Sequence, residues 1–178
     1  SNTELSLSLA MNGQLTYDTD AVVPEDYNYL DSAWYAQAAA VPGEVVFTDR
    51  FVCAIEHINE VVVAAVSPKT GYAVVVNLHQ EDFIHCHRDL NPREGSAYYL
   101  FDKNDHLLYA STPFSEVSQE QVEAYAESMN QLHSTKNGQD ITDFSGKTRT
   151  YFSAPVSNGW SCVLTVPRSA LIIGMHQV

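Results

Sequence analysis

Positively charged side chains are scarce in this chain of 178 residues, which has 9 Lys and Arg against 22 Asp and Glu and a formal net charge of −13. Nucleic acids and anionic membrane surfaces both favour clustered Lys and Arg, so this charge argues against either as a partner. Long apolar runs are missing as well, because no stretch of about 18 or more apolar residues is present to cross a bilayer. The sequence therefore predicts an acidic globular domain with no nucleic-acid partner.

Cysteine is also scarce, and Cys53, Cys86 and Cys162 lie too far apart for a CxxC or zinc-ribbon motif. At most one disulfide and one free thiol can form from them. Cys53 and Cys162 lie in apolar, strand-like runs, where a buried free thiol is the ordinary outcome. The cysteines therefore do not indicate a redox compartment.

Catalytic motifs are missing from the sequence. It has no GxSxG, P-loop, HExxH or GxGxxG motif in a strand–helix context. Carboxylates are plentiful, but no pair of them has the apolar flanks that shift the pKa of catalytic groups. We therefore expect a domain that is not itself an enzyme and that has no cofactor.

Hydrophobic residues make up 45% of the chain and aromatic residues 11%, which is enough for a core and excludes a disordered acidic tail. The chain begins with Ser1-Asn2 rather than Met, a pattern typical of tag removal, so we expect a fragment of a longer protein. Residues 170–175 turn apolar, which is typical either of the approach to a transmembrane helix or of a last element docking on the core.

The first half of the chain predicts a hairpin, a helix and three strands. Alternating apolar residues flank Asn12-Gly13, the strongest two-residue hairpin signal. A short helix is expected over 25–40, ended by Pro42-Gly43. Strands are then expected over 44–53, 60–66 and 72–78.

The second half repeats this order. A second hairpin is expected around residues 102–105, and Ser118 with Gln121 forms a capping box that begins a helix. Strands are then expected over 140–144, 148–156 and 160–166.

The repeat divides the chain into modules at 3–90 and 96–170, with a charged Pro- and Gly-containing linker over 89–95. The predicted fold class is α+β, with tandem PAS-like modules that are each a mainly antiparallel five-stranded sheet with a flanking helix. A single larger α+β sheet is the alternative.

Four segments, in this order, resemble the motifs of bacterial Cache sensor domains. Residues 31–38 (DSAWYAQA) are similar to the family's R-x-W-Y-x-x-A stretch, and residues 71–78 to its G-v-v-g-v-D-i strand. Residues 97–109 (AYYLFDKNDHLLY) and 146–167 (GKTRTYFSAPVSNGWSCVLTVP) resemble its later strand motifs.

The resemblance implies a double Cache architecture, the extracytoplasmic sensing part of bacterial chemoreceptors, histidine kinases and diguanylate cyclases. A small-molecule ligand would bind in a membrane-distal module at 3–90, and the module at 96–170 would be membrane-proximal. The parent would span the membrane and form a homodimer. The long N-terminal helix usual in the family has no counterpart in this sequence.

The resemblance places Trp34, Tyr35 and Tyr27 at the ligand pocket, although large aromatic residues on a short helix are more commonly core. Ser32 stands where amino-acid sensors of the family have an Arg that grips the ligand carboxylate, and Asn77 stands where they have an Asp that holds its ammonium group. The expected ligand is therefore neutral or differently charged.

Asp49 and Arg50 lie in the strand expected over 44–53, and Arg50 is a candidate for a relocated carboxylate clamp. Alternation in a strand points only one of the pair inward, and a surface position is the commoner outcome.

A weaker hypothesis is a metal site formed by His79, His85, Cys86 and His87. Solvated linker histidines are the simpler interpretation of this segment. The alternatives to a small-molecule sensor are therefore a metal-binding regulatory domain and a protein-interaction or dimerisation module.

Overall fold

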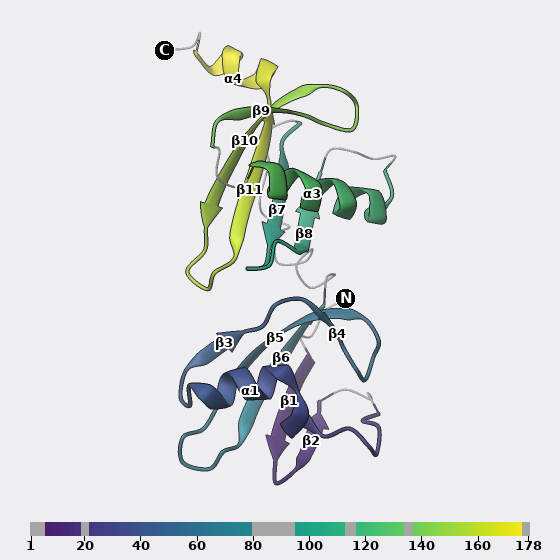
Figure 1. The fold of residues 1–178 in the computed structure, drawn as a ribbon, viewed down its shortest axis with the longest axis vertical. Coiled ribbons are helices and arrows are strands. Elements are labelled where there is room, and N and C mark those ends of the chain that lie inside the picture. The colour runs from purple at the N-terminus through teal and green to yellow at the C-terminus, as the bar shows by residue number, and fades with distance from the viewer. Residues whose placement is uncertain (1–5, 19–21, 80–94, 113–116, 134–136, 176–178) are drawn as a thin grey trace. The chain divides into compact units, whose positions relative to one another are not determined.

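The computed structural model of the chain describes residues 6–18, 22–79, 95–112, 117–133 and 137–175. The chain divides into two compact units, Ser1–Cys86 and His87–Val178, which are referred to below as the first and the second unit. Each unit contains one antiparallel sheet (Figure 1).

The first unit consists of a short helical segment packed on one sheet. Its sheet has the order β2-β1-β6-β5-β3, and β4 also pairs with β5. Its helical elements are the 3₁₀ turn η1 (Tyr29–Asp31) and α1 (Ala33–Ala40). Its strands are β1 (Ser6–Met11), β2 (Gln14–Tyr17), β3 (Val45–Phe47), β4 (Phe51–Val52), β5 (Asn59–Val66) and β6 (Ala73–His79).

The hairpin between β1 and β2 confirms the prediction made from Asn12-Gly13. Both residues have positive φ, 51° and 80°, and Met11 pairs with Gln14 across the turn. This conformation matches the twist of the flanking strands and suits Asn and Gly.

The helix expected over 25–40 is broken at Ser32, which has extended dihedral angles (φ −77°, ψ 144°). Its hydroxyl donates to the Tyr29 carbonyl oxygen at 2.5 Å and accepts from the Tyr35 N–H at 3.3 Å. The side chain therefore ends η1 and caps α1, because serine competes with the backbone for hydrogen bonds and favours caps.

The strand expected over 44–53 is also broken, into β3 and β4. Thr48 lies at the break, where its hydroxyl accepts the Val62 N–H at 2.9 Å in addition to the backbone bond from the Thr48 N–H to Val62 O. Asp49 and Arg50 therefore lie in a loop rather than in a strand, and the alternation argument does not apply to them.

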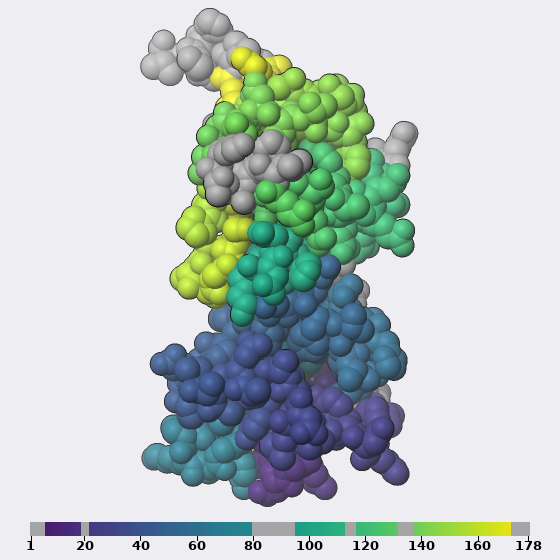
Figure 2. Space-filling view, in the orientation of Figure 1, coloured from purple at the N-terminus to yellow at the C-terminus, as the bar shows by residue number. Residues whose placement is uncertain are grey.

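The helical segment covers one face of the first sheet, which we call the inner face. Trp34 and Ala38 of α1 pack in one buried cluster with Val62, Ala64 and Val75 of the sheet. Seen from this side, the dark-blue segment that contains η1 and α1 lies across the middle of the first unit (Figure 2). The helix does not cover the end of the inner face that carries the polar residues Glu60 and Asn77, and a pocket lies over that end.

The outer face of the first sheet is apolar as well. Leu7, Val45 and Val74 on this face expose 46%, 61% and 51% of their surface. A sheet with two apolar faces has the composition of one that is covered on both sides. The register aligns two rows across the strands, Leu7–Val76–Val63–Phe47 and Leu9–Val74–Ala65–Val45.

The second unit has the same topology, with strand order β8-β7-β11-β10-β9. In both units the chain therefore makes an edge hairpin, crosses the inner face through a helical segment and returns as a meander. This arrangement confirms the predicted α+β, PAS-like fold class. The elements are β7 (Ala97–Phe101), β8 (Leu107–Ser111), α3 (Gln119–His133), β9 (Gln139–Thr142), β10 (Thr148–Pro155), β11 (Ser161–Pro167) and α4 (Arg168–Met175).

Local signals in the second unit are confirmed. The Gln121 N–H donates to the Ser118 hydroxyl at 3.3 Å, and the Ser118 N–H donates to Gln121 Oε1 at 3.1 Å, which is a capping box. Ala126 and Met129 of α3 pack on the sheet core around Tyr151. Within the described residues, no helix combines the length and hydropathy needed to span a membrane.

Candidate ligand-binding site

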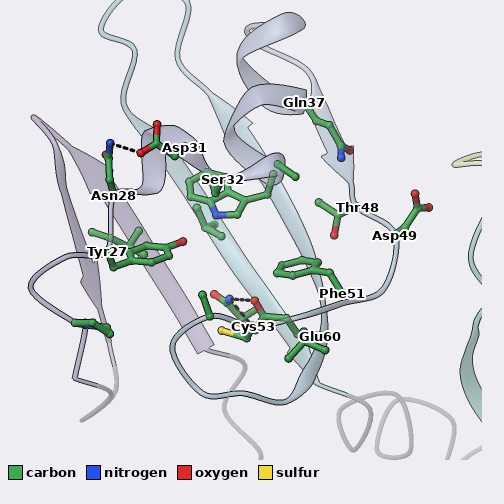
Figure 3. A pocket seen from close by; sticks show the side chains of 18 of the residues that line it. Tyr27, Asn28, Asp31, Ser32, Gln37, Thr48, Asp49, Phe51, Cys53 and Glu60 are labelled. Carbon is green, nitrogen blue, oxygen red and sulfur yellow. Dashed lines mark hydrogen bonds between the residues drawn. The ribbon is translucent and has the colours of Figure 1, made fainter.

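A pocket of about 650 Å³ lies in the first unit, over the polar end of the inner face. Residues of η1, α1, the break between β3 and β4, and the strands β2, β5 and β6 line it. This volume is typical of small-molecule sites, and the pocket combines an aromatic wall with a few polar groups. Figure 3 shows Tyr27 and Phe51 on the two sides, with Cys53 and Glu60 at the floor between them.

The floor carries a buried carboxylate, Glu60, which exposes only 3% of its surface. Asn77 donates from Nδ2 to both carboxylate oxygens at 3.2 Å, and the Ser8 hydroxyl donates to Asn77 Oδ1 at 3.3 Å. Asn77 and Glu60 are diagonal neighbours on adjacent strands, since Val62 pairs with Asn77. The amide therefore holds the carboxylate in one orientation.

Burial raises the pKa of Glu60. Hydrogen bonds from Asn77 and Cys53 and the charge of His79 lower it, but the effect of burial is larger. Burial also raises the pKa of the Cys53 thiol. A carboxylate desolvated in this way interacts strongly with a cation that reaches it, because the surroundings screen the charge poorly.

The aromatic wall contains Tyr27, Trp34 and Phe51. Burial raises the pKa of Tyr27, and this effect is larger than that of the hydrogen bonds with the side chains of Trp34 and Ser32, which lower the pKa. Trp34 exposes 5% of its surface and stacks on Tyr29, with ring centroids 6.1 Å apart. Trp34 is thus both a core residue and part of the pocket wall, and its polar edge contacts Tyr27.

The charged residues of the pocket lining are mostly acidic. Asp26, Asp31 and Asp49 belong to the lining together with one cationic side chain, Arg50. Asp31 accepts a hydrogen bond from Asn28 Nδ2 at 2.8 Å (Figure 3). With Glu60, the lining holds four carboxylates and one guanidinium group, which favours a cationic over an anionic ligand.

Five of the side chains named as ligand candidates from the sequence line this pocket: Tyr27, Trp34, Asp49, Arg50 and Asn77.

Tyr35 is not among the lining residues. Its ring packs edge-on against Tyr29 and Trp34, with centroids 5.2 and 5.7 Å away, and its hydroxyl donates to the Gly71 carbonyl oxygen at 3.5 Å. Successive residues of an α-helix point about 100° apart, so Trp34 and Tyr35 do not share a direction.

Of the metal ligands proposed from the sequence, His79 lies beside this pocket, whereas His85, Cys86 and His87 lie outside the described residues. His79 Nε2 is 3.2 Å from Glu56 Oε2 and 3.6 Å from Glu60 Oε2.

Sequence reasoning missed Glu60. The signal was present, because Glu60 is in phase with Val62, Ala64 and Val66, and these residues alternate toward the inner face. A charged residue in phase with the buried side of a strand is unusual and marks a candidate site.

A scan against protein-family models gives no match, and a search of curated proteins also gives none. Several solved structures of ligand-binding domains of bacterial chemoreceptors are similar to this chain. The ligand-binding domain of Pseudomonas fluorescens CtaA, in complex with L-isoleucine, has a TM-score of 0.67 at 19% identity, and the match covers 95% of this chain and 71% of that chain.

The ligand-binding domain of the Pseudomonas aeruginosa PAO1 amino acid chemoreceptor PctB, in complex with L-Arg, has a TM-score of 0.67 at 16% identity, covering 93% of this chain and 72% of that chain. The ligand-binding domain of Campylobacter jejuni Tlp3, in complex with 4-methylisoleucine, has a TM-score of 0.63 at 13% identity, and the match covers 94% of this chain and 66% of that chain. The chain therefore has the Cache-type fold of bacterial chemoreceptor ligand-binding domains.

Proposed function

We propose that this chain is the extracytoplasmic small-molecule sensing region of a bacterial membrane receptor, and that its first unit binds a ligand carrying a protonated amine. The observation that carries the proposal is Glu60, a buried carboxylate held by Asn77 at the floor of a pocket of about 650 Å³. The fold shared with amino-acid-binding chemoreceptor domains supports the sensing role.

A protonated amine matches this floor in charge and in hydrogen bonding. Asn77 occupies two acceptor sites of Glu60 and Cys53 occupies a third, and a carboxylate has about four in total, so one site is left to accept from an ammonium group. Tyr27 and Phe51 belong to the pocket wall, and a cation that lies over the face of either ring is attracted by the ring quadrupole. The other carboxylates of the lining add to the same preference.

The expectation of a ligand without an ammonium group rested on the missing Asp at position 77. The structure removes that premise, because Glu60 on the neighbouring strand brings a carboxylate against Asn77. The missing Arg at position 32 has no such replacement on η1 or α1, because neither element contains Lys or Arg. The Ser32 hydroxyl is hydrogen-bonded to the backbone. Arg50 is the remaining group on the pocket lining that can pair with a ligand carboxylate.

The remaining assignments belong to the same proposal. The first unit acts as the membrane-distal, ligand-binding module and the second as the membrane-proximal module of a receptor that spans the membrane and dimerises. The sensor region itself is not catalytic. Ligand binding signals if the ligand has different affinities for two arrangements of the receptor, which is the thermodynamic requirement for such coupling.

The test is a binding screen in which each amine is paired with the alcohol of the same carbon skeleton, and each α-amino acid with its decarboxylated amine. We expect amines to raise the melting temperature and to give a Kd by calorimetry, while the matched alcohols do not bind. Binding of amino acids but not of their amines would assign Arg50 a carboxylate contact. Binding of alcohols or carboxylic acids alone, or silence across the panel, would contradict the proposal.

A further inference from the structure

Beside the pocket floor lies a cluster of four side chains with different donor atoms, Cys53, Glu56, Glu60 and His79, of which Cys53 and Glu60 line the pocket. One donor atom each of Cys53, Glu56 and Glu60 lies within 4.8 Å of the other two. His79 Nε2 lies 3.2 Å from Glu56 Oε2 and 3.6 Å from Glu60 Oε2. The thiol and the two carboxylates therefore form one group, and the imidazole of His79 adjoins this group on the side of the two carboxylates.

The backbone around β4, β5 and β6 positions these side chains. The turn after β4 is closed by hydrogen bonds from the Cys53 N–H to Ile58 O at 2.8 Å and from the His57 N–H to Cys53 O at 2.9 Å. This turn brings Glu56 back beside Cys53. Glu60 and His79 are directly opposite each other in the β5–β6 register, so their side chains project from the same face.

The donor set suits zinc. Zn²⁺ takes four ligands in a tetrahedron, with sulfur at about 2.3 Å and nitrogen or oxygen at about 2.0–2.2 Å. Ligand atoms at these bond lengths lie about 3.3–3.8 Å apart in a tetrahedron, close to the two separations of His79 from the carboxylates. Asn77 is placed as the outer-shell partner that orients Glu60.

We propose that Cys53, Glu56, Glu60 and His79 bind a Zn²⁺ ion, or a divalent transition metal of similar chemistry, at the floor of the first unit's pocket. Figure 3 shows that Cys53 and Glu60 lie next to each other at the floor of the pocket. Bound metal would occupy the carboxylate to which the ammonium group of a ligand binds. Metal and amine therefore compete, a consequence that rests on the proposed function.

The metal site is tested by cobalt titration of the purified chain with its affinity tag removed. A Cys86→Ser/Cys162→Ser background leaves Cys53 as the single thiol, so a thiolate-to-cobalt charge-transfer band reports on that residue. We expect one equivalent of Co²⁺ to produce the band and Zn²⁺ to displace it. Adding Cys53→Ser abolishes the band, and His79→Gln weakens binding by more than about tenfold.

Two controls separate this site from its alternatives. Glu44→Gln removes an exposed carboxylate of the same unit and leaves the titration unchanged. Metal binding that survives Cys53→Ser but is lost with His85→Gln/His87→Gln would assign the metal to the segment proposed from the sequence and overturn the inference. A chain that stays folded and binds no cobalt would overturn it too.

The competition is measured by calorimetry of an amine found in the screen, with and without saturating Zn²⁺. We expect at least a tenfold weaker apparent affinity with the metal present, and no change in the Cys53→Ser variant. Cobalt binding without any amine binding would leave the metal site standing and remove the proposed function. Amine binding that ignores Zn²⁺ at a proven cobalt site would overturn the competition alone.

Discussion

Replacement of Glu60 by Gln tests whether the buried carboxylate is the anchor for a cationic ligand. The substitution keeps the size and shape of the side chain and leaves one oxygen to accept from Asn77, which now donates to both carboxylate oxygens at 3.2 Å. It removes only the charge and one acceptor. A loss of binding in this variant therefore reports on electrostatics rather than on packing.

The expected loss of affinity follows from the burial of Glu60, which exposes 3% of its surface. Removing one partner of a buried, hydrogen-bonded charge pair costs about 2–5 kcal/mol, which is roughly a 30- to 5,000-fold increase in Kd. Because burial raises the pKa of Glu60, the affinity of the wild-type protein for an amine also falls as the pH is lowered through that raised pKa. The variant has no such pH dependence.

The stability of Glu60→Gln changes in the opposite direction. The folded state keeps the Glu60 proton to a higher pH than the unfolded chain does, so the wild-type protein loses stability as the pH rises from about 4.5, the ordinary value, through the raised pKa. Glutamine resembles the protonated form and carries no such penalty. We therefore expect the free energy of unfolding of the variant to exceed that of the wild type at pH 7.5 and to converge with it at pH 4.

The assay combines calorimetry of a bound amine with urea unfolding at the two pH values, and Glu44→Gln serves as the matched exposed control. A variant that is at least as stable at neutral pH but binds weakly identifies a carboxylate kept for function. Wild-type affinity in Glu60→Gln would refute the anchor, and a loss of stability at neutral pH would refute the argument from desolvation.

Four further substitutions test the core packing, one turn and a buried ion pair. Trp34→Ala is expected to lower the free energy of unfolding by about 3–5 kcal/mol, because Trp34 is 5% exposed in the first core, and urea unfolding measures the loss. Gly13→Ala should cost about 1 kcal/mol in the same assay, since φ is +80° and nothing lies within 4 Å of the added methyl group. Arg149→Ala should cost about 3–5 kcal/mol by leaving Asp143, 3.5 Å from its guanidinium group, as a buried carboxylate without its ion pair. Burial raises the pKa of Asp143, but hydrogen bonds from Ser145 and Lys147 and the charge of Arg149 outweigh burial, so the pKa is lowered overall. The stability that the ionised Asp143 contributes is therefore lost as the pH falls through that lowered pKa. Asp143→Asn should flatten the acid limb of the curve of unfolding free energy against pH.

The fold was predictable from the sequence where the signals are local. Asn12-Gly13 predicts its hairpin because the turn type requires positive φ at both residues, and Ser118 with Gln121 predicts a helix start because both side chains bond the backbone. Each signal depends only on neighbours in the chain. The repeated order of these elements was then sufficient to predict the PAS-like class.

The two breaks in predicted elements arise from side chains that replace backbone hydrogen bonds. Ser32 interrupts the expected helix, and Thr48 interrupts the expected strand by accepting the Val62 N–H from a strand 14 residues away. The partner of Ser32 is local, and its position before an apolar helix was a readable cap signal. The partner of Thr48 is known only once the strands are paired, so that break was not predictable from the sequence.

The candidate site shows the same limit. Amino-acid sensors of the Cache family have an Asp where this chain has Asn77. From that difference alone, the pocket was expected to lack a carboxylate that binds an ammonium group. The register of β5 against β6 puts Glu60 within hydrogen-bond reach of that amide, so the carboxylate reaches the pocket from the adjacent strand. A binding site depends on which charges meet in space rather than on the strand that carries them. The loss of one charged residue from a motif therefore excludes a ligand only after every neighbour on the same face of the sheet has been considered.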